Sequence, residues 1–513
     1  MTLRHKPVQH LAALLTLCAS TGLLAQSPVN GIYTRQYENV LGTSLEIKLR
    51  APDAATEQKA EAAVLAEIDR ENAILSAWQP NSEFSVWLKT RNTPVKVSPE
   101  LLDVLSLFDG WRQQTGGALD ASAETAVRVW KSAEADQRTP TAQELSAAVA
   151  TMQQPHWKLD RAAGTATHLD DAPIALNSFA KSYITGHAAS AALAAGATGV
   201  SLNMGGDIVL RGSLTQKIAV ANPRADAEND PPLDTIQVAN RTVATSGAYR
   251  RGVDINGRHF SHIIDPRTGA TAEHILSSTV IAPDASEAGA LATAFSVMTP
   301  AQSKALAARL RNVDYLLVTA AGETITSPGW SKLETAHLQP ASYTLPQQQK
   351  KAAPKKAAAP APPPPHLDLL ISLELAAPEG GRFHRPYVAV WIEDKDHNSL
   401  KTIALWSQKP RYLEDLRSWY RDAKVSSTDI AMTVSSATRS AGKYTLRWDG
   451  LNDAGKPVPP GKYTVLIEAA REHGTYQLMR QEIDFDGRTV QKFTLPGNTE
   501  ISGASLDYGA HEQ

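Results

Sequence analysis

The residues best suited to chemistry gather first in a segment that runs from Leu176 to Gly212. It opens with a turn of small residues, Asn177 and Ser178, and enters an alanine-rich stretch that predicts a helix carrying Lys181. The start of a helix offers unpaired N–H groups and the positive end of the helix dipole. This stretch therefore suits a phosphate or pyrophosphate.

The same segment ends in a paired-glycine motif. After the predicted helix stops near glycines 196 and 199, an apolar strand breaks at Gly205-Gly206-Asp207. Paired glycines inside a strand mark either a bulge or a place where the backbone comes close to another group. A bound ligand is one interpretation of this motif, and a plain bulge is the other.

Hydroxyl groups and a histidine follow further along the chain. The run Thr245-Ser246-Gly247-Ala248-Tyr249-Arg250 predicts a turn rich in hydroxyls. His262 stands three residues before the Asp265-Pro266 turn, so its ring can face the same cavity as the carboxylate. Histidine is the side chain best suited to proton transfer near neutral pH. The pattern leaves an alternative open, in which Asp265-Pro266 caps a turn and His262 is an ordinary strand residue.

The flanking patterns predict an α+β domain that positions these motifs. Alternating or continuous apolar runs predict strands over residues 43–49, 235–238, 277–282 and, as the last strand, 315–319. Polar caps predict that helices begin at Asp53, Ser98 and Asp284. Trp78, in the loop after the first helix, is expected to fill the core rather than to offer a stacking surface for a flat ring.

A Pro/Ala/Lys-rich linker over residues 341–366 separates this domain, residues 30–340, from a second one over residues 367–510. Short strands with turn signals predict an all-β, Ig-like sandwich there. Residues 462–469 are expected to return as the partner strand of residues 443–448. The sandwich tryptophans are expected in its core: Trp391, Trp406, Trp419 and Trp448.

The bulk composition bounds the class of protein. A chain of 513 residues with a net charge of −2 offers no basic field for nucleic acid. Residues 1–25 predict a secretory signal peptide whose apolar core is too short to span a bilayer, and no later stretch is long enough. We therefore expect an exported, periplasmic protein without a transmembrane span. Cys18, the only cysteine, lies in the signal and leaves lipoprotein anchoring as a minor alternative because Leu17 before it is large.

Residues from about 37 to 330 resemble the FAD:protein FMN transferase family, also called ApbE, through a series of motifs in the family's order. These are residues 78–83 (WQPNSE), 116–120 (GGALD), 180–183 (AKSY), 203–207 (NMGGD), 245–249 (TSGAY), 262–269 (HIIDPRTG) and 288–293 (AGALAT). The resemblance implies an ApbE-like domain with a T-fold-type core. Residues 367–508 similarly resemble an uncharacterised periplasmic sandwich family found fused to this enzyme.

The resemblance implies an enzyme that binds FAD and Mg²⁺ and moves FMN onto a Ser or Thr of a partner protein, releasing AMP. It implies flavin and adenosine contacts from Trp78, Leu119 and Asp120, and phosphate contacts from Lys181, Gly205, Gly206 and Asp207. It implies a cavity lined by Thr245, Ser246 and Tyr249, with His262, Asp265 and Lys181 at the chemistry. The metal would be held by the Ala180 carbonyl, by Thr293 and by an aspartate four residues before Thr293.

Three features depart from that pattern. Gly289 stands where the metal aspartate is expected, and a hard cation held without a carboxylate should bind weakly. Asp284 and Glu287 are the nearest candidates to replace it. Ser182 replaces a usual glycine after the lysine, and residues 176–179 (LNSF) stand where an acidic residue and two glycines are usual.

Three functions remain open on these grounds: a transferase, a degenerate FAD-binding protein, and a Mg²⁺-dependent FAD hydrolase. The acceptor is expected to carry a Ser/Thr-Gly-Ala-Ser/Thr-like motif. Two strings in this chain resemble it, residues 265–271 and residues 502–505. Self-modification at Ser505 is a minor hypothesis.

Overall fold

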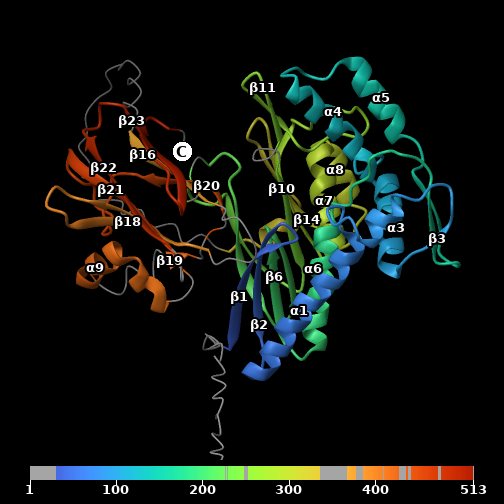
Figure 1. Cartoon of the computed structure of the whole chain (residues 1–513), viewed down its shortest axis with the longest axis horizontal. Coiled ribbons are helices and arrows are strands. Elements are labelled where there is room, and N and C mark those ends of the chain that lie inside the picture. Colours follow the sequence, from blue (N-terminus) through green and yellow to red (C-terminus); the bar gives the residue numbers. More distant parts are fainter. Residues whose placement is uncertain are drawn as a thin grey trace, which may run out of the picture.

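The computed structural model of the chain describes residues 31–225, 227, 229–247, 252–335, 367–376, 385–407, 410–426, 435–436, 439, 441–471 and 475–511. These form an N-terminal domain of mixed helices and strands and a C-terminal domain made mainly of strands (Figure 1), which confirms both predicted fold classes. The predicted signal peptide and linker lie outside the described residues, so the domain boundaries stay predictions. No helix in the described part of the chain is long and apolar enough to cross a membrane.

The N-terminal domain is organised around an eight-stranded sheet whose neighbouring strands are all antiparallel. In spatial order its strands are β1 (Ile32–Val40), β2 (Thr43–Arg50), β6 (Gly199–Met204), β7 (Asp207–Gly212), β10 (Thr242–Gly247), β13 (Ile275–Ala282), β14 (Asp314–Thr319) and β15 (Thr324–Thr326). In β2 the side chains of Leu45, Ile47 and Leu49 are fully buried, as the alternation predicts. The expectation that residues 315–319 form the last strand is wrong, because β15 pairs beyond them at the sheet edge.

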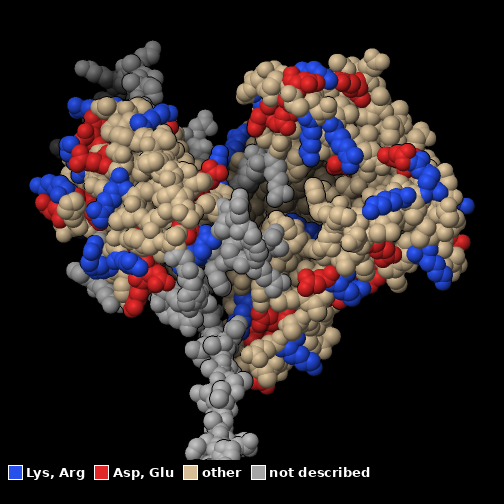
Figure 2. All heavy atoms as spheres, in the orientation of Figure 1, with Lys and Arg blue, Asp and Glu red and all other residues tan. Residues whose placement is uncertain are grey.

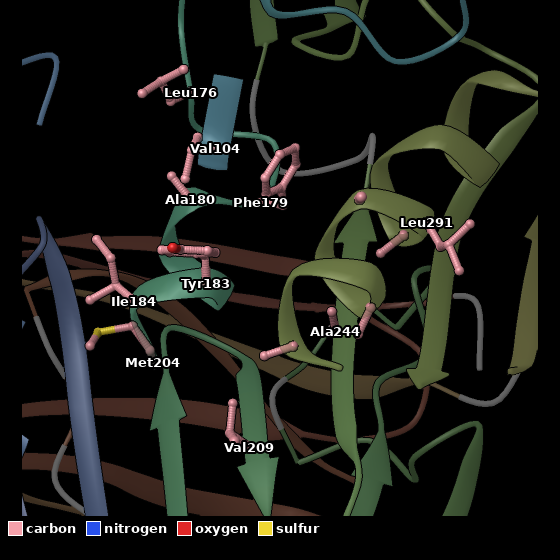
Figure 3. Packing of buried hydrophobic residues seen from close by; sticks show 14 of the residues in the cluster. Val104, Leu176, Phe179, Ala180, Tyr183, Ile184, Met204, Val209, Ala244 and Leu291 are labelled. Atoms are coloured by element: carbon pink, nitrogen blue, oxygen red, sulfur yellow. The ribbon is translucent and has the colours of Figure 1, made fainter. Parts of the chain in front are cut away.

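Three helices cover one face of this sheet: α1 (Ala54–Leu75), α6 (Ala180–Ala194) and α7 (Ala285–Val297). Figure 3 shows Tyr183 and Leu291 from these helices in the same cluster as Met204 and Val209 from the strands. Alanines dominate α6 and α7, and their small side chains let helix and sheet approach closely. This close packing fixes the start of α6, where Lys181 lies.

The predicted helix starts are confirmed by their caps. The side chain of Asp53 accepts a hydrogen bond from the backbone N–H of Thr56 at 2.7 Å, before α1. Ser98 caps α3 (Pro99–Gln114) in the same way, and Asp284 caps α7. A capping oxygen satisfies one of the N–H groups that a helix leaves unpaired, so these starts are specified locally.

A two-stranded sheet, β8 (Thr215–Val220) and β9 (Asp234–Ala239), packs against the opposite face of the large sheet. Successive side chains of β7 point to opposite faces of the large sheet. Leu210 packs in the cluster that contains Trp330, whereas Val209 packs in the core on the helix side. The remaining elements of this domain are α2 (Glu83–Trp87), β3 (Val95–Lys96), η1 (Ala121–Ala123), α4 (Glu124–Ala135), α5 (Ala142–Met152), β4 (Trp157–Asp160), β5 (Thr165–His168), β11 (Gly252–Ile255), β12 (Arg258–Ser261), α8 (Pro300–Ala307) and η2 (Trp330–Lys332).

The C-terminal domain is a sandwich of two sheets with a helical cover on one outer face. One sheet contains β20 (Gly442–Trp448), β16 (Asp368–Leu375), β24 (Ile501–Gly509) and β23 (Gln491–Leu495). The other contains β19 (Ser435–Ser436), β18 (Ser399–Trp406), β17 (Tyr387–Glu393), β21 (Gly461–Ala470) and β22 (Tyr476–Phe485). The cover is η3 (Pro410–Asp415) and α9 (Arg417–Ser426). The four sandwich tryptophans are buried, as predicted.

The expected pairing of residues 443–448 with residues 462–469 is wrong. β20 pairs with β16, whereas β21 pairs with β17 and β22 in the opposite sheet. The connection between them therefore crosses from one sheet to the other. Both strands carry apolar residues for the shared core, so alternation alone cannot separate a hairpin from a crossing of this kind.

A charged contact joins the two domains. Arg447 on β20 lies 2.8 Å from Asp230, which belongs to the loop between β8 and β9, and also pairs with Asp368. Asn229 exchanges two hydrogen bonds with the backbone of Arg447, at 2.7 and 2.8 Å. Elsewhere on the face shown in Figure 2, acidic and basic side chains are interspersed. The sandwich is thus held against the same β8–β9 unit that covers the large sheet.

Candidate active site

A cavity of about 700 Å³ lies where the sequence motifs of the N-terminal domain meet. Its lining comes from the segment before η1, the start of α6, the β6–β7 turn, β10, the segment after β12 and the middle of α7. The predicted site residues among the lining are Leu119, Asp120, Lys181, Gly205, Gly206, Asp207, Thr245, Ser246, His262 and Thr293. These positions are spread over most of the domain sequence, and the fold brings them together.

The start of α6 gives the cavity its positive charge. Lys181 Nζ lies 3.7 Å from Asp207 Oδ2, and its side chain is one-third exposed. The N-cap of α6, Phe179, provides no side-chain cap, although the Ala180 N–H donates a hydrogen bond to the Leu176 carbonyl at 3.1 Å. Burial raises the pKa of Asp207, while the Lys181 ammonium and a hydrogen bond from Ser182 counteract that rise. A lysine and an uncapped helix start at one cavity wall favour an anionic ligand.

The paired glycines form a tight hairpin turn between β6 and β7, not a bulge. Gly205 has φ +59° and Gly206 has φ +102°, a region that side-chain-bearing residues rarely adopt. A Cβ on Gly205 would also come within 2.3 Å of Thr43 Oγ1. The turn therefore presents backbone without side chains to the cavity. This agrees with the interpretation that the glycines let the backbone come close to another group.

Asp120 is held firmly beside the cavity. Its Oδ1 accepts hydrogen bonds from the backbone N–H and the hydroxyl of Ser122, at 2.8 and 2.7 Å. Its Oδ2 lies 2.9 Å from Arg112 Nε. These contacts orient the short helix η1 and leave the carboxylate with most of its acceptor capacity in use.

His262 and Asp265 are separated by the fold. His262 lines the cavity and is exposed, whereas Asp265 is not among the described lining residues. Both Asp265 carboxylate oxygens accept hydrogen bonds from the Arg267 guanidinium at 2.8 Å, and Oδ1 also accepts from the Arg267 backbone. Asp265 therefore caps a turn, as one of the two alternatives predicts. His262 faces the cavity, as the other alternative predicts.

The sequence model of the ApbE family matches residues 41–317, just over half of the chain and the part that builds this cavity. The chain belongs to the ApbE family. Residues 368–503 match a second family, described as a predicted periplasmic protein of the DUF2271 group. The predicted resemblances of both domains are thus confirmed.

Curated relatives of the ApbE domain are named FAD:protein FMN transferases. The protein from Klebsiella pneumoniae is 27% identical over 289 residues, which cover 54% of this chain and 82% of that protein. The one from Haemophilus influenzae is 27% identical over 292 residues, 54% of this chain and 84% of that protein. The structure of an ApbE protein from Thermotoga maritima superimposes with a TM-score of 0.53 at 25% identity, over 59% of this chain and 99% of that one.

Two further predicted ApbE site residues are not among the described lining residues. Trp78 is 87% exposed on the loop after α1, so the expectation that it fills the core is wrong. The Ser76 hydroxyl holds its loop by accepting hydrogen bonds from the backbone N–H groups of Trp78 and Gln79. Tyr249 lies outside the described residues.

Several residues that line the cavity lie outside the sequence motifs, so the sequence did not predict them as site residues. Ile218, Val220 and neighbouring residues of β8 reach the cavity from the second sheet, and Val127 reaches it from α4. Thr279 lines it from β13, with its hydroxyl 3.0 Å from that of Thr245. The sequence can indicate that β8 and β13 are strands, but only the packing of separate sheets decides which side of each strand faces the ligand.

The residues expected to hold a metal do not fit one. Gly289 and Thr293 line the cavity, but Gly289 has no side-chain ligand atom and Ala180 is not among the described lining residues. The Thr293 hydroxyl donates a hydrogen bond to the Ser178 carbonyl at 3.2 Å. Asp284 and Glu287 do not replace the missing aspartate, since neither lines the cavity and Asp284 caps α7. Mg²⁺ binds tightly through oxygen ligands that include a carboxylate. The α7 residues among the described lining supply none, and Asp207, which also lines the cavity, is already paired with Lys181 and Ser182.

Proposed function

We propose that the ApbE domain binds FAD in this cavity and transfers FMN to a Ser or Thr hydroxyl of a partner protein, releasing AMP. The observation that supports it best is the meeting of Lys181, the bare Gly205-Gly206 turn and His262 at one cavity in a chain of this family. The reaction forms a bond between the acceptor oxygen and the FMN phosphorus. It breaks the phosphoanhydride bond, and AMP leaves with the electron pair.

In this proposal different residues bind the pyrophosphate, contact the ring systems and accept the proton. The pyrophosphate lies against Lys181, the uncapped start of α6 and the backbone of the glycine turn, with Asp207 orienting the lysine. Leu119 and Asp120 contact the ring systems, and Thr245 and Ser246 line the acceptor side. His262 takes the proton of the attacking hydroxyl, and Asp265 holds the turn after it.

The Mg²⁺ ion that the family resemblance implies enters no step of this proposal, because Gly289 removes its carboxylate ligand. The acceptor is a separate protein with a Ser/Thr-Gly-Ala-Ser/Thr-like motif. Ser505 in this chain is a poor acceptor, because its backbone is paired with β16 on one side and β23 on the other. Export to the periplasm by residues 1–25 completes the proposal, supported by the family of the C-terminal domain.

Mass spectrometry of a purified acceptor domain after incubation with this protein and FAD tests the transfer. We expect a gain of about 438 Da, the mass of FMN less one water, on the acceptor threonine or serine. An acceptor in which that residue is alanine is the control. If FAD binds but the acceptor mass does not change, the transfer is contradicted.

A second candidate, supported by Gly289, is an FAD-binding protein without transfer activity. It predicts one FAD per chain in a dialysis experiment and no AMP release. A Mg²⁺-dependent FAD hydrolase predicts AMP and free FMN without an acceptor. Chromatography of the nucleotides from the same incubation separates all three outcomes.

A further inference from the structure

The two positions at which this chain departs most from the ApbE pattern touch each other. A Cβ built on Gly289 would lie 2.6 Å from Ser182 Oγ, 3.1 Å from Ser182 Cβ and 3.2 Å from Phe179 Cβ. Contacts below about 3 Å are not tolerated without movement of one partner. Ser182 on α6 therefore occupies the space into which any side chain at position 289 on α7 would have to extend.

The Ser182 hydroxyl is fixed in that space. It is 1% exposed, and it donates a hydrogen bond to Asp207 Oδ2 at 2.8 Å. The same carboxylate oxygen lies 3.7 Å from Lys181 Nζ. One oxygen of Asp207 thus faces a neutral donor and a cation, both from the first turn of α6.

These contacts leave little that could hold a resident cation. The Thr293 hydroxyl is directed to the Ser178 carbonyl, and Asp207 is already compensated by Lys181 and Ser182. A divalent ion placed here would also lie close to the Lys181 ammonium, and like charges repel strongly at a partly buried site. The positive charge that the wall offers to a ligand is that of Lys181.

We infer that Ser182 and Gly289 are a matched pair that replaces a cation-binding carboxylate by a neutral hydrogen bond to Asp207. The cavity then binds the pyrophosphate of FAD through Lys181 and backbone N–H groups, independently of a divalent cation. The part that concerns FAD rests on the function proposed above. The part that concerns the pair does not.

FAD titrations of the full chain, followed by flavin fluorescence, test the cation independence. We expect the wild-type dissociation constant to change less than about twofold between 5 mM EDTA and 5 mM MgCl₂, both experimental conditions chosen to exceed any carried-over metal. The double variant Ser182→Gly/Gly289→Asp is expected to bind FAD at least about tenfold more tightly with Mg²⁺ than with EDTA. A tenfold effect of EDTA on the wild type would overturn the inference.

Thermal unfolding without FAD tests the pair by itself. Gly289→Ala should lower Tm by several degrees, because its methyl group collides with Ser182, and Ser182→Gly in that background should restore most of the loss. Ser182→Gly alone measures the combined cost of lower helix propensity and of the lost hydrogen bond to Asp207. Additive effects of the two substitutions would overturn the matched pair.

The two experiments also separate this inference from the proposed function. A wild-type chain that binds no FAD under either condition contradicts the proposed function and the cation-free binding together. The coupling in Tm then still supports or overturns the Ser182–Gly289 pair.

Discussion

At the scale of single residues, the cavity depends on a small set of polar groups with different partners. Lys181 is the one lysine among the described lining residues, which include no arginine. It lies beside Asp207, so the carboxylate orients the ammonium while reducing its net charge. His262, in the segment after β12, lines the same cavity. Replacing Lys181 is therefore expected to weaken FAD binding, whereas replacing His262 is expected to slow FMN transfer.

Lys181→Met should weaken FAD binding by about tenfold to a hundredfold, the usual value of a hydrogen bond to a charged group. The substitution keeps the length of the side chain and removes its charge. Flavin fluorescence quenching measures the dissociation constant. Lys217→Met on β8 is the matched control, since Lys217 is exposed and outside the cavity lining. Equal affinities for Lys181→Met and wild type would place the pyrophosphate elsewhere.

His262→Asn should lower the rate of FMN transfer by about a hundredfold or more while changing FAD affinity less than about threefold. A general base acts on the attacking hydroxyl and contributes little to ground-state binding. Single-turnover transfer rates and FAD titrations measure the two effects. His259→Asn on β12 is the control, because His259 pairs with Asp254 in an exposed hairpin. Parallel losses of rate and affinity would indicate a binding residue instead.

At the scale of elements, the positions of α1 and α6 against each other depend on a buried acid. Glu71 on α1 is fully buried and accepts a hydrogen bond from His187 on α6, with Arg70 nearby at 3.2 Å. Burial raises the pKa of the Glu71 carboxyl. The hydrogen bond to Glu71 raises the pKa of His187 above its ordinary value of 6.5. Charged His187 therefore compensates a carboxylate that water cannot reach.

This pair predicts a pH dependence of stability. Because the folded-state pKa of His187 is raised, its contribution is fully present below pH 6.5 and is lost as pH rises through the raised value. The free energy of unfolding, measured with urea, should therefore fall as the pH rises above 6.5 and through the raised pKa. His187→Gln should be less stable at the lower pH and lose most of that slope. The exposed His259→Gln should keep it, and an unchanged slope in His187→Gln would contradict the assignment.

At the scale of the whole molecule, a polar contact region joins the sandwich to the ApbE domain. Arg447 is largely buried and bridges Asp230 of the ApbE domain and Asp368 of its own domain. His511 Nδ1 lies 2.5 Å from the other oxygen of Asp368, close to the end of the chain. The loop that carries Asp230 joins β8 and β9, and β8 lines the cavity. The domain contact thus lies one loop away from the ligand site.

Asp230→Ala should uncouple the two domains, with a loss of about 1–3 kcal/mol from the charge-assisted contact. Arg447 would keep Asp368, so each domain should remain folded. Differential scanning calorimetry should then show two separated transitions, and small-angle scattering a larger radius of gyration. Asp453→Ala, which removes a pair with Lys401 inside the sandwich, is the control. A single unchanged transition in Asp230→Ala would mean that this contact does not orient the domains.

Local signals predicted much of this protein from the sequence alone. Asp53, Ser98 and Asp284 begin helices because a capping side chain acts on N–H groups two or three residues away. The alternation in β2 and the burial of the sandwich tryptophans follow from side-chain periodicity and apolar area in the same local way. The order of short motifs indicated the family, because each motif is read without knowledge of its neighbours in space.

Only the tertiary structure decided which of these parts meet. It separated Asp265 from the cavity, exposed Trp78, and placed β20 and β21 in different sheets. It also brought Ser182 against Gly289, Glu71 against His187 and Asp230 against Arg447. Each of these contacts joins residues that are far apart in the chain. Their geometry is set by the packing of whole helices and sheets, which no local pattern contains.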